Sequence, residues 1–263
     1  METAKGRRRL LSAIAVTVAL LGSAACAGSK PERVADGRFL VVAGFYPLAE
    51  VAREVGGDLV DVRDLTPAGA EPHDLELTTD QVDLVEDADL VLYLGGGFQP
   101  AVASAAKRAG GTRLDGLAGE SGADPHVWLD PRGLSRIVER TSDALVDALD
   151  VDDERAATIR SNATEYLREL EGLDAEMASG LADCERRVIV TSHDAFGRLA
   201  ARYDLEQIAI AGLAPEAEPD PRRLAELTDE IRDRDVTTVF SEALVSPEVA
   251  ETLAREAGVR AAV

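Results

Sequence analysis

Cysteine is scarce in this sequence. Only two of its 263 residues are cysteines, Cys26 and Cys184, so the chain has neither a disulfide framework nor a zinc site built from several thiolates. If Cys26 carries a lipid, as argued below, Cys184 is left without a partner. We expect Cys184 to be a small, half-buried residue at the end of a helix.

The sequence also has far fewer basic residues than acidic residues. The chain carries 28 Lys and Arg against 49 Asp and Glu, and its formal net charge is −21. A surface this acidic repels nucleic acid and anionic lipid and raises the local concentration of cations. The charge therefore argues against nucleic acid as a partner and favours a cationic ligand.

The apolar run at the N-terminus is too short for a permanent membrane span. It covers Leu10–Leu21 and follows the basic residues Lys5 and Arg7–Arg9, whereas crossing the ~30 Å hydrocarbon layer takes about 20 apolar residues. A basic start, a short apolar segment and the small residues Gly22–Ala25 are typical of an export signal. We therefore expect residues 1–25 to be a signal peptide that is removed.

Cys26 follows these small residues directly, and a polar segment comes after it. Small residues before a cysteine resemble a bacterial lipobox. A lipidated Cys26 anchors a protein outside the cytoplasm, on the cell membrane, and residues 26–38 then form a tether. The alternative is an ordinary signal peptide followed by an incidental cysteine; we favour lipidation.

Short apolar runs and amphipathic segments alternate along residues 39–150, which predicts a parallel sheet covered by helices on both faces. The expected strands are 39–43, 59–65, 89–94 and 112–114, and the expected helices are 46–55, 78–88, 98–110 and 134–149. This segment is the expected N-terminal α/β lobe.

Residues 152–183 predict a much longer helix. Its apolar residues recur at steps of three and four from Ile159 to Leu181, which places them on one face of the helix, and packing against the rest of the protein explains such a stripe. We expect the segment 151–184 to be a rigid connecting helix that runs along two lobes.

The alternation resumes in residues 185–263, the expected C-terminal α/β lobe. The expected strands are 187–191, 205–211, 236–241 and 259–263, and the expected helices are 194–203, 221–235 and 247–257. Asp220 is the expected N-cap of its helix, because Pro221 suits the first helical position. Since the last strand has only begun at Val263, we expect the sequence to lack its natural C-terminal part.

The chain has only three histidines, and each lies where one element gives way to another. They occur in Glu-Pro-His73-Asp, Asp-Pro-His126-Val and Thr-Ser-His193-Asp. Ligands of parallel α/β sheets bind beyond the carboxyl ends of strands, and His73 and His193 both follow an expected strand. These positions predict that the histidines share one cleft.

Three neutral imidazoles are good ligands for zinc, with a carboxylate or a water as the fourth ligand. The neighbouring acids Asp74 and Asp194 are candidates to orient the rings. Taken singly, each histidine is more commonly a loop residue that bonds to backbone. The acidic surface and the shared position of the three favour a metal site.

The sequence resembles the zinc and manganese substrate-binding lipoproteins of bacterial ABC importers, called cluster A-I. The segments that carry the resemblance are FYPL (45–48), PAGAEPHDLELT (67–78), DPHVWLDP (124–131), NATEYLRELEGL (162–173), TSHDAFGRL (191–199), PEAEPDP (215–221) and FSEALVSP (240–247). They follow the family's order and span nearly the whole chain after the signal peptide.

The resemblance implies a monomeric protein with two α/β lobes joined by a long helix, one metal between the lobes and an ABC permease as partner. It places His73, His126 and His193 on three ligand positions. A histidine at the third position indicates zinc rather than manganese, since imidazole suits zinc and carboxylates suit manganese. Zinc is therefore the expected ligand and manganese the alternative.

The fourth ligand departs from the family pattern. The family's usual fourth ligand is a C-terminal aspartate, which no residue here matches, and the His-rich acidic loop of many zinc-specific members is absent. Glu242 is one candidate for the fourth ligand, and a water molecule is an equal candidate. Alternatively, the carboxylate of Glu242 only accepts backbone hydrogen bonds near the end of a strand.

Two other classes of function share parts of this pattern. Three histidines and an open position also describe a secreted zinc hydrolase, but the sequence contains neither HExxH nor GxSxG. In an adhesin-like surface lipoprotein the metal would be structural, and its removal would unfold the chain. We expect a receptor and no enzyme.

Overall fold

The computed structural model describes residues 37–148, 151–215 and 219–263. The expected signal peptide, Cys26 and the tether as far as residue 36 lie outside these ranges. None of the helices in the described ranges is both long enough and apolar enough to cross a membrane. All described residues belong to one unit, Pro31–Val263.

The first sheet has four parallel strands in the order β2-β1-β3-β4. They are β1 (Phe39–Ala43), β2 (Val60–Asp64), β3 (Leu90–Tyr93) and β4 (Thr112–Asp115). Because successive side chains of a strand point to opposite faces, Val41 and Leu92 pack into one core cluster whereas Val42 and Val91 pack into another. The sheet is therefore apolar on both faces, as a parallel sheet between two layers of helices requires.

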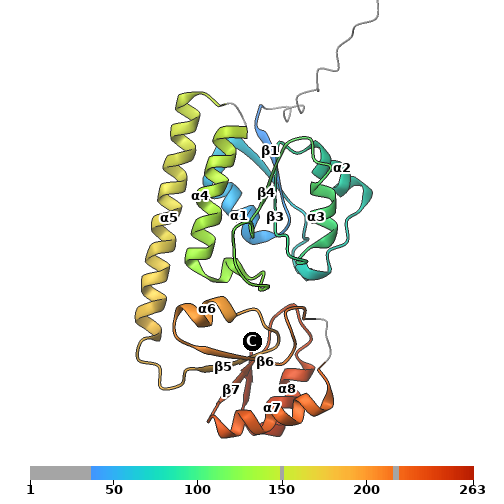
Figure 1. Cartoon of the computed structure of the whole chain (residues 1–263), viewed down its shortest axis with the longest axis vertical. Coiled ribbons are helices and arrows are strands. Elements are labelled where there is room, and N and C mark those ends of the chain that lie inside the picture. Colours follow the sequence, from blue (N-terminus) through green and yellow to red (C-terminus); the bar gives the residue numbers. More distant parts are fainter. Residues whose placement is uncertain (1–36, 149–150, 216–218) are drawn as a thin grey trace, which may run out of the picture. The chain divides into compact units, whose positions relative to one another are not determined.

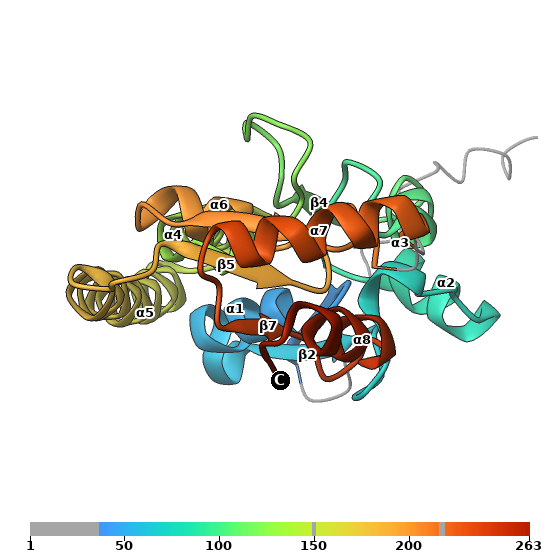
Figure 2. The same cartoon turned by 90° about the horizontal axis from the view of Figure 1, so that it is seen from below.

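Helices cover each of these faces. One core cluster includes α1 (Tyr46–Gly56), α4 (Pro131–Ala148) and the first half of α5 (Asp153–Leu181). The other includes α2 (Thr79–Asp87) and α3 (Pro100–Ala106). Helix α2 begins at a capping box in which Thr78 and Gln81 bond to each other's backbone N–H. The helices α4 and α5 lie side by side (Figure 1 and Figure 2).

Helix α5 packs into this core from its start as far as Leu170. Ile159, Ala163 and Leu170 are buried there against α1 and α4. Beyond them, Leu173 is 45% exposed. The expected apolar stripe is therefore a packing face only as far as Leu170, and the second half of α5 leads on towards the second sheet (Figure 1).

The second sheet is also parallel, with the order β6-β5-β7-β8. Its strands are β5 (Val188–Thr191), β6 (Glu206–Ala209), β7 (Thr238–Phe240) and β8 (Arg260–Ala262), and its helices are α6 (Gly197–Arg202), α7 (Pro221–Asp233) and α8 (Glu248–Ala257). Val190 and Val239 pack against Leu227 and Ile231 of α7 and Leu253 of α8 in one core cluster. The fold class predicted from the sequence, two parallel α/β lobes with a long connecting helix, is confirmed.

Two expectations differ from the structure. The helix expected at 194–203 begins only at Gly197, because the N–H of Asp194 donates to the Gly212 carbonyl and that of Ala195 donates to the His193 carbonyl. These bonds form a loop in place of a first helical turn. Cys184, expected to be half-buried, is exposed.

Candidate metal site

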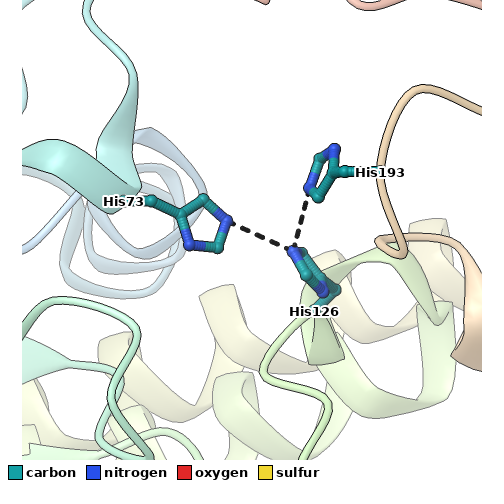
Figure 3. A group of neighbouring side chains, drawn as sticks. All are labelled: His73, His126 and His193. Carbon is teal, nitrogen blue, oxygen red and sulfur yellow. Dashed lines mark hydrogen bonds between the residues drawn. The ribbon is translucent and has the colours of Figure 1, made fainter. Parts of the chain in front are cut away.

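The three histidines come together from three loops at the carboxyl ends of strands. His73 lies in a 3-10 helix (Pro72–Asp74) that follows β2, His126 precedes a 3-10 helix (Val127–Leu129) that follows β4, and His193 follows β5. Figure 3 shows the three rings turned towards one another. The structure therefore brings together the three histidines that the sequence analysis singled out.

The ring nitrogens are close enough to hold one ion. The Nε2 of His126 is 3.3 Å from the Nε2 of His73 and 3.3 Å from the Nε2 of His193. One nitrogen from each ring lies within 4.8 Å of the other two, and among the described residues these three form the one such group of potential ligands. Two nitrogens bound at ~2.0–2.1 Å to a tetrahedral zinc are roughly 3.3–3.4 Å apart. The separations of His126 Nε2 from the Nε2 atoms of His73 and His193 therefore match the distance between two nitrogens bound to a tetrahedral zinc.

His126 is held in place by an acid two residues before it. The Asp124 carboxylate accepts from the His126 backbone N–H at 2.9 Å and lies 2.7 Å from its Nδ1. A carboxylate only accepts hydrogen bonds when it is ionised, so Nδ1 is the donor and the lone pair of Nε2 faces the other rings. His126 is 1% exposed, which fixes the ring further.

His193 has the same arrangement with a distant partner. Its Nδ1 lies 2.6 Å from Oε1 of Glu242, and the hydroxyl of Ser192 donates to the same oxygen at 2.5 Å. The His193 carbonyl accepts from the Thr191 hydroxyl at 2.8 Å and from the Gln207 amide at 2.9 Å. These bonds hold both the ring and the backbone of a residue that is 4% exposed.

His73 is held through its backbone. Its N–H donates to the Glu71 carboxylate at 3.2 Å, and the carbonyl of the preceding Pro72 accepts from the Gln99 amide at 3.1 Å. The ring packs edge-on against Phe98, with 4.5 Å between centroids. Gln99 also donates to the Gly44 carbonyl and the Thr66 hydroxyl, so one buried amide joins the loops that follow β1 and β2.

Charges at the site favour a cation. Burial, reinforced by repulsion from His126 and His193, lowers the pKa of His73 to about 4, so this ring is neutral and able to bind metal at neutral pH. Burial raises the pKa of Glu242, but the hydrogen bonds from His193 and Ser192 outweigh it and leave a net lowering. The pKa of Asp124 is lowered in the same way by its bonds from His126. Both carboxylates are therefore charged at neutral pH and lie behind the rings of His126 and His193.

Aromatic rings close one side of the site. Trp128, the only tryptophan of the chain, lies 5.2 Å from the ring of His126 and 5.2 Å from that of Phe98. Phe45 packs against both Phe98 and Trp128 at centroid distances of 4.9 and 4.7 Å. This apolar wall limits water near the imidazoles, which strengthens charge interactions within the site.

The acids that orient the rings were not those expected. Among the described residues, the carboxylates that accept from imidazole nitrogens belong to Asp124 and Glu242 rather than to Asp74 and Asp194. An Asp side chain commonly accepts from the backbone N–H two residues further on, in an Asx-turn, and here that turn brings the carboxylate of Asp124 beside the ring of His126. Asp124 could have been found by this rule; Gln99, Gln207 and Ser192 gave no such signal.

Fold and site together define a two-lobed α/β protein with a group of three histidines that could hold a cation. The family model for ZnuA, described as zinc-uptake complex component A, periplasmic, matches residues 41–263. The chain therefore belongs to this family.

Individual proteins agree with the family. The zinc-binding lipoprotein AdcA of Streptococcus pneumoniae is 34% identical over 95% of this chain and 54% of its own length. The high-affinity zinc uptake system protein ZnuA of Bacillus subtilis is 31% identical over 90% of this chain and 82% of its own. The crystal structure of the Zn(II)-bound ZnuA-like domain of S. pneumoniae AdcA is 34% identical with a TM-score of 0.72, and covers 86% of each chain. The chain thus spans about half the length of several curated relatives that it matches.

Proposed function

We propose that the protein is an extracytoplasmic receptor that binds one zinc ion through His73, His126 and His193 and delivers it to an ABC permease. The observation that carries the proposal is that the Nε2 atoms of His73 and His193 each lie 3.3 Å from Nε2 of His126, while carboxylates hold the rings of His126 and His193 at Nδ1. The family and the names of the relatives support zinc as the ligand. No catalytic role is part of the proposal.

The outer residues have separate roles in this proposal. Asp124 and Glu242 accept from the Nδ1 atoms of two ligands, fix their tautomers and increase the basicity of Nε2. Because Oε1 of Glu242 already accepts two hydrogen bonds, we assign Glu242 to this orienting role and a water to the fourth ligand position. Manganese, which prefers oxygen ligands, fits the three imidazoles less well.

The remaining parts of the proposal concern location and assembly. We infer that residues 1–25 are removed, that a lipid on Cys26 anchors the protein to the membrane and that residues 26–38 form the tether. We also infer a monomer whose lobes are 39–150 and 185–263, joined by the segment 151–184. Metabolic labelling with a fatty acid, with Cys26→Ser as the matched variant, tests the anchor.

Competitive titration of chelator-stripped protein, residues 27–263, with zinc and manganese tests the receptor. The fluorescence of Trp128 is a direct readout, because its ring lies 5.2 Å from that of His126. We expect one zinc per chain, manganese bound more weakly, and loss of affinity in each of the three histidine-to-alanine variants. Equal, weak binding of both metals by folded protein would overturn the assignment.

A further inference from the structure

Arg198 of α6 joins the two lobes at the loop that carries the His126 partner. Its guanidinium donates to the Glu120 carboxylate at 2.9 Å, to the Asp124 carbonyl at 2.8 and 3.1 Å and to the Ser121 carbonyl at 3.3 Å. Its Nε is also 3.8 Å from Oδ2 of Asp124. One side chain from the second lobe thus bonds to the segment 120–124 of the first at four points.

This segment has little regular structure of its own. Gly122 within the segment and Gly119 just before it have φ values of 90° and 86°, which only glycine adopts readily. Arg198 and Glu120 have side-chain exposures of 16% and 14%, so the ion pair is shielded from most of the solvent. Glu120 also accepts from Arg136 of α4. The segment is therefore held between one arginine of its own lobe and one of the other.

The bonds continue without a break to a metal ligand. Arg198 holds the backbone of Asp124, the carboxylate of Asp124 accepts from Nδ1 of His126, and Nε2 of His126 faces the other two rings. Removing Arg198 would take away the two bonds to the Asp124 carbonyl, and a shift of Asp124 would turn the imidazole that its carboxylate holds. The position of α6 in the second lobe is thereby coupled to the orientation of a ligand in the first.

We propose that Arg198 is a positioning residue that couples contact between the lobes to metal affinity at His126. This inference rests on the proposed function, since it concerns the same site. When α6 moves away from the segment 120–124, the orienting bond behind His126 weakens and the metal leaves faster. Separation of the lobes and release of the ion are then one event.

A second arginine of α6 provides a matched control. Arg202 forms a bidentate ion pair with Asp130 across the same pair of lobes. Oδ1 of Asp130 also accepts from the Arg132 N–H at the start of α4. This ion pair therefore contributes to the contact between the lobes, but its carboxylate bonds to the backbone at the start of a helix and not to an imidazole.

The experiment compares Arg198→Ala, Arg198→Lys and Arg202→Ala in the full chain after the signal peptide. Loss of an outer partner lowers metal affinity by about 10–100-fold, and Arg198 is one residue further out. We therefore expect a loss of about 10-fold in Arg198→Ala, mainly as faster dissociation, partial recovery in Arg198→Lys and less than about 2-fold in Arg202→Ala.

A second readout needs no metal. In apo protein labelled with ¹⁵N-histidine, we expect Arg198→Ala to shift or broaden the Nδ1–H signal of His126 and to leave that of His193 unchanged. We expect Arg202→Ala to leave both signals unchanged. Equal affinity losses in the two alanine variants, or an unchanged His126 signal in Arg198→Ala, would overturn the proposal. If wild-type protein binds zinc no better than His126→Ala, the proposed function fails, and the apo spectra still decide the positioning role.

Discussion

The two sheets have the same strand order, but they place different kinds of residue at the corresponding crevice. In each, the first strand lies between the second and the third, and the fourth lies beyond the third. The crevice between the first and third strands is where such sheets bind ligands. In the second sheet this crevice supplies His193 and its partner Glu242; in the first it supplies Gly44 and Gln99, which support a histidine from a neighbouring loop.

This difference shows how one architecture can support a histidine in two ways. The second lobe places its proposed ligand and the acid that bonds to it just after two adjacent strands. The first lobe extends two loops instead, and holds one proposed ligand by a local acid and the other by its backbone. The predictions below test whether the two lobes contribute equally to metal binding, from the largest expected effect to the smallest.

Removing a ligand should have the largest effect. His73→Ala, His126→Ala and His193→Ala are each expected to lower zinc affinity by more than about 100-fold, beyond the loss of an outer partner. Chelator competition measures the affinities, and circular dichroism checks that each variant is folded. A variant within 10-fold of wild type would remove that histidine from the ligand set.

Neutralising the orienting acids should have an intermediate effect. Asp124→Asn and Glu242→Gln keep the size of the side chain but remove its charge, and we expect each to lower zinc affinity by about 10–100-fold. Similar losses would show that a local and a distant acid act alike. If Glu242→Gln matched the loss in His193→Ala, Glu242 would be a ligand after all. Asp74→Asn, outside these contacts, is the control.

Substitutions of Gln99 and Gln207 distinguish a histidine that is held through its backbone from one whose ring is held by an acid. Gln99→Ala leaves the carbonyl of Pro72 without this donor, whereas the carbonyl of Gly44 still accepts from the Thr66 hydroxyl, and one unsatisfied buried group costs about 1–3 kcal/mol. We expect denaturant unfolding of the apo protein to show a loss in that range and zinc affinity to fall as the His73 loop moves. Gln207→Ala, which leaves the His193 ring with Glu242, should weaken zinc binding less.

Tyr203 provides the smallest effect and a dependence on pH. Burial and its hydrogen bond to Asp174 raise the pKa of Tyr203 to about 12. Since the ordinary value is 10.0, the stabilisation is complete below pH 10 and is lost as pH rises towards 12. Tyr203→Phe should lower apo stability by about 0.5–1.5 kcal/mol at pH 8, with a difference that shrinks above pH 10. Zinc affinity at pH 8 should not change.

Local patterns in the sequence were sufficient for most of the fold. Alternating apolar runs predicted each strand found in the described ranges, and Asp152, Thr78 and Asp220 mark helix starts through their capping bonds. The helix expected from residue 194 was wrong at its start because long-range bonds to Gly212 hold that segment as a loop. Such bonds depend on tertiary contacts that no local pattern records.

The same limit applies to the site. The three histidines could be singled out from the sequence because each lies where a strand or loop gives way to another element. Asp124 is close to its ligand in sequence, whereas Glu242 is 49 residues from His193 and Arg198 is 74 residues from Asp124. Glu242 was predicted as a ligand candidate, and the structure places it behind His193. Glu242 reaches Nδ1 of His193 only because β5 and β7, the strands that precede the two residues, are parallel neighbours in the sheet.

X-ray absorption at the zinc edge of zinc-loaded protein tests the central claim most directly. The account predicts about four nitrogen or oxygen ligands at ~2.0–2.1 Å, with outer-shell scattering from three imidazoles and no sulfur near ~2.3 Å. Fewer than three imidazoles, a sulfur ligand or an octahedral shell of oxygens would contradict the three-histidine site.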